Sequence, residues 1–148
     1  MNTDRVNSFL KYQFPAIFWA LCIFVESSVP GRKLPVFPHG FDKLVHATIF
    51  FILCWFVHRA FRFQTNTLIL HTSLFLAVAV SIFYGVTDEF HQIYVPGRTP
   101  DPYDLLADSM GAALYVMIVT IAYVREAIAR KKGSLSRSHA DDGSRKRK

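Results

Sequence analysis

Residues 67–87 read TLILHTSLFLAVAVSIFYGVT and contain no Asp, Glu, Lys or Arg. The hydrocarbon core of a bilayer is about 30 Å thick, and a helix of roughly 20 apolar residues crosses it. Backbone N–H and C=O groups cannot stay unpaired in lipid, so an apolar run of this length favours a helix. The segment therefore predicts a transmembrane helix.

Three further apolar segments have a similar character, at about residues 14–29, 43–61 and 103–124. Hydrophobic residues make up 51% of the 148 residues and charged residues only 19%, which excludes a fully disordered chain and argues against a small soluble domain. We therefore predict an all-α integral membrane protein, a bundle of four transmembrane helices. Cys22 and Cys54 lie inside apolar runs and are predicted to be buried thiols rather than a disulfide.

The net charge of +6 comes from residues 125–148, which hold nine basic and three acidic residues. Residues 1–124 carry no net charge, which argues against a nucleic-acid-binding surface. We predict a transmembrane domain over residues 1–124 and a basic, disordered cytoplasmic tail over residues 125–148.

The basic residues also predict the orientation of the helices. The N-terminal segment, the connection that contains Arg59 and Arg62, and the tail together hold 13 of the 17 Lys and Arg residues. Basic segments flanking transmembrane helices tend to stay in the cytoplasm. We therefore predict that both termini are cytoplasmic and that the connections at residues 30–42 and 88–102 face outward.

Polar residues gather at the outer ends of the predicted helices, whereas the inner half is almost without them. This distribution argues against a transport path. A polar or ionisable residue inside a membrane helix is a functional candidate. The candidate ligand-binding residues are Asp42, His46, Glu89, Gln92, Arg98, Asp104 and Asp108.

The start of the second span holds three polar residues. Asp42 is a helix N-cap or a ligand-binding residue, and Lys43 is interpreted as a side chain that reaches the lipid headgroups. His46 lies one turn further in and is a hydrogen-bonding residue, a base or a ligand. Together with Glu89, it is the candidate for acid–base catalysis.

The start of the fourth span has the pattern of a capped helix, with Asp101 as N-cap and Pro102 in the first turn. Further along this span, four residues follow each other at spacings of four, three and four, and they are Asp104, Asp108, Gly111 and Tyr115. Such spacings place them in one stripe along the helix, which we expect to face the bundle. Asp108 is then expected to pair with His46, Arg98 or a backbone group.

Arg98 follows a Pro-Gly turn and has several candidate partners. Its guanidinium contacts lipid phosphates, or it holds Glu89, Asp104 or a phosphorylated ligand through two parallel hydrogen bonds. His46, Glu89 and His91 have suitable chemistry for a metal, but three such residues without ligand spacing are weak support. We predict no metal and no cofactor.

The outward motifs resemble those of the VanZ-like membrane protein family. They are Asp42-Lys43-x-x-His46, Tyr84-Gly85-x-x-x-Glu89-x-x-Gln92, Pro96-Gly97-Arg98 and Asp104-x-x-x-Asp108-x-x-Gly111. The resemblance covers about residues 40–115 and implies structural roles for Gly85, Gly97 and Gly111. Members of the family commonly carry Asn where this chain has Asp108.

The type member of that family is associated with resistance to the glycopeptide teicoplanin. The resemblance therefore implies a multi-pass protein of the bacterial cytoplasmic membrane with a role in the cell envelope and in antibiotic resistance. We expect the outward residues to bind an envelope component, such as a lipid-linked intermediate, or a glycopeptide-type antibiotic. The alternative is an intramembrane hydrolase or transferase acting on a lipid-phosphate or peptidoglycan intermediate. The expected partners are the lipid bilayer and such a ligand, without nucleic acid.

The predicted orientation can be tested with reporter fusions. A reporter joined after Arg62 should be active only as a cytoplasmic reporter, because Arg59 and Arg62 hold that connection inside. A reporter joined after Arg98 should behave in the opposite way. An extracytoplasmic signal from the Arg62 fusion would refute the topology.

Overall fold

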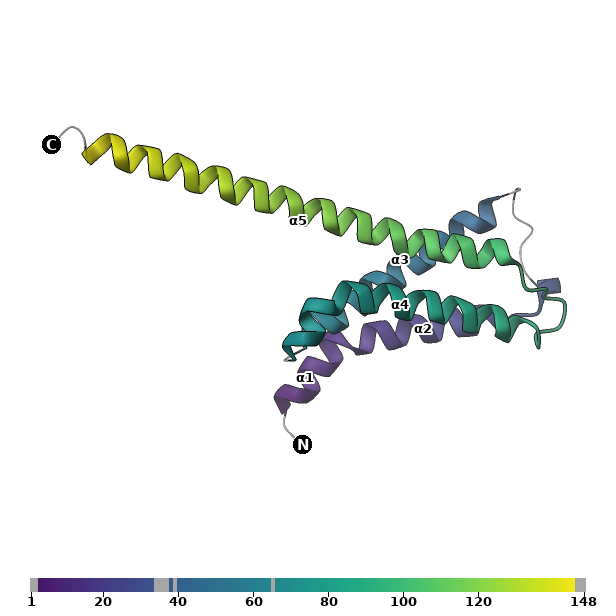
Figure 1. The fold of residues 1–148 in the computed structure, drawn as a ribbon. Coiled ribbons are helices and arrows are strands. Elements are labelled where there is room, and N and C mark those ends of the chain that lie inside the picture. Colours follow the sequence, from purple (N-terminus) through teal and green to yellow (C-terminus); the bar gives the residue numbers. More distant parts are fainter. Residues whose placement is uncertain (1–2, 34–37, 39, 65, 146–148) are drawn as a thin grey trace. The chain divides into compact units, whose positions relative to one another are not determined.

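The computed structural model describes residues 3–33, 38, 40–64 and 66–145, and within these residues every regular element is a helix (Figure 1). The prediction of an all-helical chain is therefore confirmed. The elements are α1 (Thr3–Tyr12), α2 (Phe14–Ser27), the 3-10 turn η1 (Gly31–Lys33), α3 (Phe41–Arg62), α4 (Thr67–Gln92) and α5 (Pro102–Arg145).

Three helical segments are long and apolar enough to cross a membrane: Phe41–Arg62, Thr72–Gln92 and Pro102–Gly133. A fourth crossing exists if α1 and α2 form one broken span, since Val6–Tyr12 and Phe14–Ser27 meet at a bend of 46°. Pro15 explains this break, because its ring lacks an N–H and clashes with the carbonyl four residues earlier in a continuous helix.

Helix α4 extends beyond the predicted third span and ends at Gln92. The residues from Asp88 to Gln92 therefore lie on a helix, not in a loop. The predicted outer connection at residues 30–42 includes residues 34–37 and 39, which lie outside the described part of the chain.

The chain divides into two compact units, Met1–Val116 and Met117–Lys148. Within the second unit, α5 continues as far as Arg145, although the sequence predicts disorder from about residue 125 onward. No proline follows Pro102, so the helical hydrogen-bond pattern meets no obligatory break. A domain boundary near residue 124 stays a prediction.

The first unit has a small buried core and a largely apolar exterior. Phe50, Leu53 and Cys54 are buried, whereas large apolar side chains such as Phe75 and Phe83 are exposed. An extended apolar exterior is what lipid requires and what water disfavours. Both cysteines are free thiols, but the prediction that both are buried is wrong for Cys22, which lies on the exposed side of α2.

Two side-chain hydrogen bonds hold α2 against its neighbours. Trp19 Nε1 donates to the carbonyl of Ile49 on α3 at 3.1 Å. The Tyr84 hydroxyl on α4 donates to the carbonyl of Ala20 at 2.6 Å. Both acceptors are backbone carbonyl oxygens in the middle of helices. These two hydrogen bonds therefore fix the position of α2 along the axes of α3 and α4.

The predicted stripe on α5 faces the bundle. Gly111 lies directly against the backbone of Ala47 on α3, and a Cβ atom at this glycine would overlap the Ala47 carbonyl oxygen. One turn further along, the Tyr115 hydroxyl lies 2.7 Å from His58 Nδ1. Small residues allow this kind of close helix approach in membranes.

His58 corrects the expectation that the inner half of the bundle is almost without polar residues. His58 is only 4% exposed and lies near the end of α3, away from every candidate residue predicted from the sequence. The partner, Tyr115, also belongs to the predicted stripe. A hydrogen-bonded pair of this kind satisfies polar atoms that would otherwise be costly to bury.

We predict that Gly111→Ala destabilises the protein. The new methyl group would overlap the Ala47 carbonyl and force α3 and α5 apart, at a cost of about 1–3 kcal/mol. Thermal unfolding of the purified protein in a neutral detergent measures the effect. Gly133→Ala is the matched control, because nothing lies within 4 Å of a Cβ atom there. Equal melting temperatures for the two variants would contradict the close contact.

Candidate functional site

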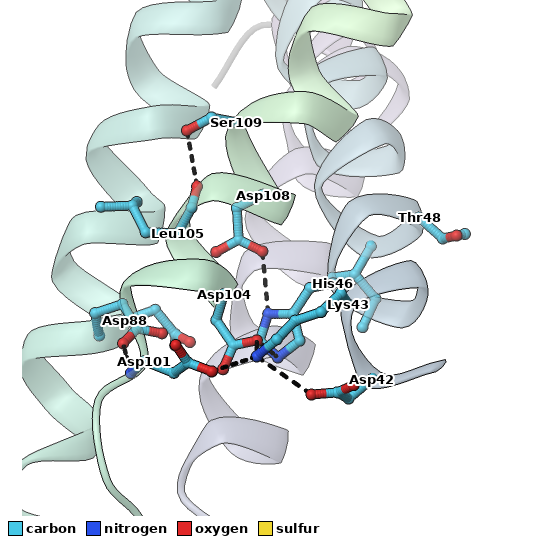
Figure 2. Close-up of polar contacts among 12 residues, drawn as sticks. Asp42, Lys43, His46, Thr48, Asp88, Asp101, Asp104, Leu105, Asp108 and Ser109 are labelled. Carbon is cyan, nitrogen blue, oxygen red and sulfur yellow. Dashed lines mark hydrogen bonds and ion pairs between the residues drawn. The ribbon is translucent and has the colours of Figure 1, made fainter. Parts of the chain in front are cut away.

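Polar side chains from three helices meet where α3 begins, α4 ends and α5 begins (Figure 2). Hydrogen bonds and ion pairs join these groups one to the next. We call this group the polar cluster. Its members are Asp42, Lys43, His46, Glu89, Asp101, Asp104 and Asp108.

Lys43 is the centre of the polar cluster. Its Nζ atom donates to Asp101 Oδ2 at 2.5 Å and to Asp104 Oδ1 at 2.6 Å. Asp42 Oδ2 lies at 3.2 Å from the same nitrogen. An ammonium group has three donors, and three carboxylates surround it here. The interpretation of Lys43 as a headgroup-reaching side chain is therefore wrong, because the acids of α5 lie within its reach.

Asp101 caps α5 as the sequence predicts. Its Oδ1 atom accepts from the backbone N–H of Tyr103 at 2.9 Å, and its carbonyl accepts from that of Asp104 at 2.8 Å. Helix α5 begins at Pro102, which has no N–H to satisfy. The hydrogen bond from Lys43 lowers the pKa of the Asp101 carboxyl, so this group keeps its charge at neutral pH.

The first turn of α3 differs from the prediction. The N-cap position is occupied by Gly40, whose φ of 81° is in the left-handed region, and not by Asp42. Glycine adopts this backbone conformation without steric cost. Asp42 instead lies in the first turn, where a negative charge also interacts favourably with the helix dipole.

His46 lies between two carboxylates of α5. Its Nδ1 atom is 3.0 Å from Asp108 Oδ1, and its Nε2 atom is 3.6 Å from Asp104 Oδ1. Of the three partners expected for Asp108, which were His46, Arg98 or a backbone group, the structure shows His46. One carboxylate thus orients the ring through a hydrogen bond, and the other faces its second nitrogen.

Asp108 is the most deeply buried charged residue of the polar cluster, with 1% of its side chain exposed. Its second oxygen, Oδ2, has no hydrogen-bond partner among the described residues. A Cβ atom at Gly85 would lie 3.2 Å from this oxygen, so the glycine on α4 leaves room beside it. The structural role expected for Gly85 is therefore to leave space for the Asp108 carboxylate.

Glu89 joins the polar cluster through the backbone of the α4–α5 connection. Its Oε2 atom accepts from the N–H of Asp101 at 2.8 Å. Its Oε1 atom is buried and has no partner in the described part of the chain. Gln92 is placed elsewhere, since its Nε2 atom donates to Asp88 Oδ2 at 3.3 Å.

Arg98 is paired with the end of α2. Its Nη2 atom donates to Glu26 Oε1 at 3.1 Å and to the Glu26 carbonyl at 3.2 Å. Its Nε atom donates to the Val29 carbonyl at 3.2 Å. Arg98 forms its ion pair with Glu26, and none of the described ion pairs joins it to Glu89 or Asp104, so those two of its expected alternatives are wrong.

The turn before Arg98 brings two glycines together. Gly97 has a φ of 76°, which agrees with its predicted place in a Pro-Gly turn. The N–H of Gly31 donates to the Pro96 carbonyl at 3.1 Å, and a Cβ atom at Gly31 would overlap the Gly97 carbonyl. Together with Arg98, this contact fixes the α4–α5 connection to the end of α2.

The described residues contain no group of three His, Cys, Asp or Glu side chains arranged to hold a metal ion. His91, a candidate in the sequence, lies against α2, where its Nε2 atom is 3.0 Å from the Ser28 hydroxyl. His46 and Glu89, the other two candidates, belong to the polar cluster.

Sequence reasoning undervalued two residues of this region. The sequence places Lys43 at the headgroups, although acids three residues apart at the start of α5, Asp101 and Asp104, indicate a shared cationic partner. Glu26 near the end of the first predicted span is not among the candidate residues, yet it is the acidic partner of Arg98.

A family model described as VanZ/LLP1 matches residues 4–123 of the chain. The match covers more than half of the sequence and includes every member of the polar cluster. Comparisons with curated proteins and with solved structures find no match.

We predict that Lys43→Met lowers the stability of the protein. The substitution keeps most of the side-chain volume but leaves Asp101 and Asp104 facing each other without the ammonium. Loss of charged hydrogen bonds of this kind costs about 2 kcal/mol. The change is measured as the shift in thermal unfolding in detergent.

Arg130→Met is the matched control for this experiment. Arg130 forms an exposed ion pair with Glu126 at 3.7 Å, within a single helix. Such exposed pairs contribute little to stability. Equal melting temperatures for the Lys43→Met and Arg130→Met variants would show that the Lys43 ammonium does not stabilise the polar cluster.

Proposed function

Because the chain belongs to the VanZ/LLP1 family and has several apolar helices of membrane-spanning length, we propose that it is a bacterial cytoplasmic-membrane protein whose polar cluster binds a cell-envelope component or a glycopeptide-type antibiotic. In this proposal the polar cluster faces outward, because the basic segments of the chain flank the opposite ends of the helices.

The observation that carries the proposal is a pair of buried carboxylate oxygens without partners. Glu89 Oε1 and Asp108 Oδ2 come from different helices, and neither accepts a hydrogen bond from a described residue. Leaving a buried acceptor unsatisfied costs about 1–3 kcal/mol. A ligand that donates hydrogen bonds to these oxygens would recover that free energy.

The charge of the polar cluster indicates what kind of ligand group would bind. Five carboxylates surround one ammonium and one imidazole, so the cluster favours hydroxyl and ammonium groups over phosphate. Arg98, the nearby phosphate-binding candidate, already donates to α2. We therefore propose recognition of a sugar or amino-sugar portion, which envelope precursors and glycopeptides share.

We predict that Glu89→Gln weakens ligand binding by about tenfold or more, since an amide N–H₂ would replace the free acceptor oxygen. The measurement is calorimetric titration of the protein in lipid nanodiscs with a glycopeptide and, separately, with a lipid-linked peptidoglycan precursor. Glu126→Gln is the matched control, because its side chain is 66% exposed and lies outside the cluster. Undiminished affinity in Glu89→Gln would refute the proposed site.

A hydrolase or transferase is the alternative, and the His46–Asp108 pair is the observation that favours it. A carboxylate 3.0 Å from an imidazole nitrogen is the arrangement in which an acid orients a general base. In this alternative His46 or Glu89 activates water against a lipid-phosphate or peptidoglycan intermediate.

Turnover separates the alternative from binding alone. An enzyme would release product from a lipid-phosphate intermediate, and His46→Gln would abolish release while leaving the melting temperature near that of the native chain. A binding protein would leave the intermediate intact in both forms. Product release at equal rates in both forms would exclude His46 as the base.

A further inference from the structure

A pocket lies between α2 and α4, and none of its lining residues belongs to the polar cluster. Its volume is about 180 Å³, and one acid, a threonine and three aromatic or imidazole rings form its walls. Drug-sized ligands occupy pockets of roughly 300–1,000 Å³, so this one fits a single small group. The lining residues are Phe24, Tyr84, Thr87, Asp88 and His91.

The acid in this pocket is buried without a cation. The Asp88 side chain is 6% exposed, and its Oδ2 atom accepts a long hydrogen bond from Gln92 Nε2 at 3.3 Å. None of the ion pairs made by the described residues includes Asp88. Burying an unpaired carboxylate is costly, so a positively charged ligand would be strongly favoured here.

The two hydroxyl groups in the pocket walls already donate their hydrogens. The Tyr84 hydroxyl donates to the Ala20 carbonyl, and the Thr87 hydroxyl donates to the Tyr84 carbonyl. With their hydrogens used, both oxygens can only accept from a ligand, and an ammonium group is a donor. The walls also offer aromatic faces, which attract cations.

The hydrogen bond with Ser28 determines which nitrogen of the His91 ring carries the hydrogen. The Ser28 hydroxyl donates its single hydrogen to the Phe24 carbonyl at 2.7 Å. It must then accept at the 3.0 Å contact with His91, so the Nε2 atom of His91 carries the hydrogen. The His91 ring lies 4.6 Å from that of Phe24, and together they form one wall of the pocket.

We propose that the pocket between α2 and α4 binds an organic ammonium group, which pairs with the Asp88 carboxylate and contacts the ring of Phe24. A trimethylammonium or a primary alkylammonium has suitable charge and size. Such a group belongs either to a small soluble amine or to a phospholipid headgroup, and the exposed position of Phe24 and Thr87 leaves the pocket open to both. None of the described hydrogen bonds or ion pairs joins Asp88 to the polar cluster.

The test uses choline and its uncharged analogue 3,3-dimethyl-1-butanol, which has nearly the same shape. The full chain is placed in nanodiscs of phosphatidylglycerol, which has no amine, and binding is measured by calorimetry. Choline should bind and the neutral analogue should not. Asp88→Asn should weaken choline binding by about tenfold or more, since it removes the charge without changing the shape.

A second variant separates binding from folding. Phe24→Leu keeps the wall apolar but removes the aromatic ring, and it should weaken choline binding by about threefold. Glu126→Gln, which changes an exposed acid elsewhere, should bind like the native chain. Equal binding of choline and its neutral analogue, or native affinity in a folded Asp88→Asn variant, would overturn the proposal.

Changing the lipid of the nanodisc distinguishes a lipid headgroup from a soluble amine as the ligand. If the ligand is a headgroup, nanodiscs that contain phosphatidylethanolamine should compete with choline, and native mass spectrometry should detect that lipid retained by the native chain but not by Asp88→Asn. If the ligand is a soluble amine, choline affinity should not depend on the lipid. Absence of both choline binding and lipid retention would refute the site.

Discussion

The attraction between one ammonium and the acids at the start of α5 organises the polar end of this protein. Lys43 on α3 contacts Asp101 and Asp104, which belong to the cap and first turn of α5. Without that cation, the acids that cap α5 and satisfy its dipole would repel those that surround His46. The same interaction therefore fixes the distance between two helices and permits a dense group of carboxylates to exist at a helix end.

The hydrogen bonds of Arg98 and those of the polar cluster hold different helices together. Arg98 holds the α4–α5 connection to the end of α2 through Glu26 and a backbone carbonyl. The connection is thereby attached to a helix that contributes nothing to the cluster itself. Glu89 then reaches back to the N–H of Asp101, so all three helices around the cluster are linked through one short segment.

Much of the fold was predictable because helix length, capping and spacing are local properties. An uncharged run revealed α4, and an Asp-Pro pair marked the start of α5. Spacings of four and three placed Asp108 on the face that meets the bundle, with His46 as one of three expected partners. The partner of Arg98 was not predictable, since Glu26 lies 72 residues away and the choice between it, Glu89 and Asp104 depends on helix height and rotation. The buried His58 was missed for the same reason, because only the packed structure places Tyr115 beside it.

The different surroundings of the two thiols have a practical consequence. Cys54 is completely buried between helices, whereas Cys22 lies on the exposed face of α2. A membrane-permeant spin label or fluorophore would therefore modify the native chain at a single position, without any engineered cysteine. Because α2 is the helix held by Arg98 and forms one wall of the ammonium pocket, a probe at Cys22 would report directly on movements of that helix.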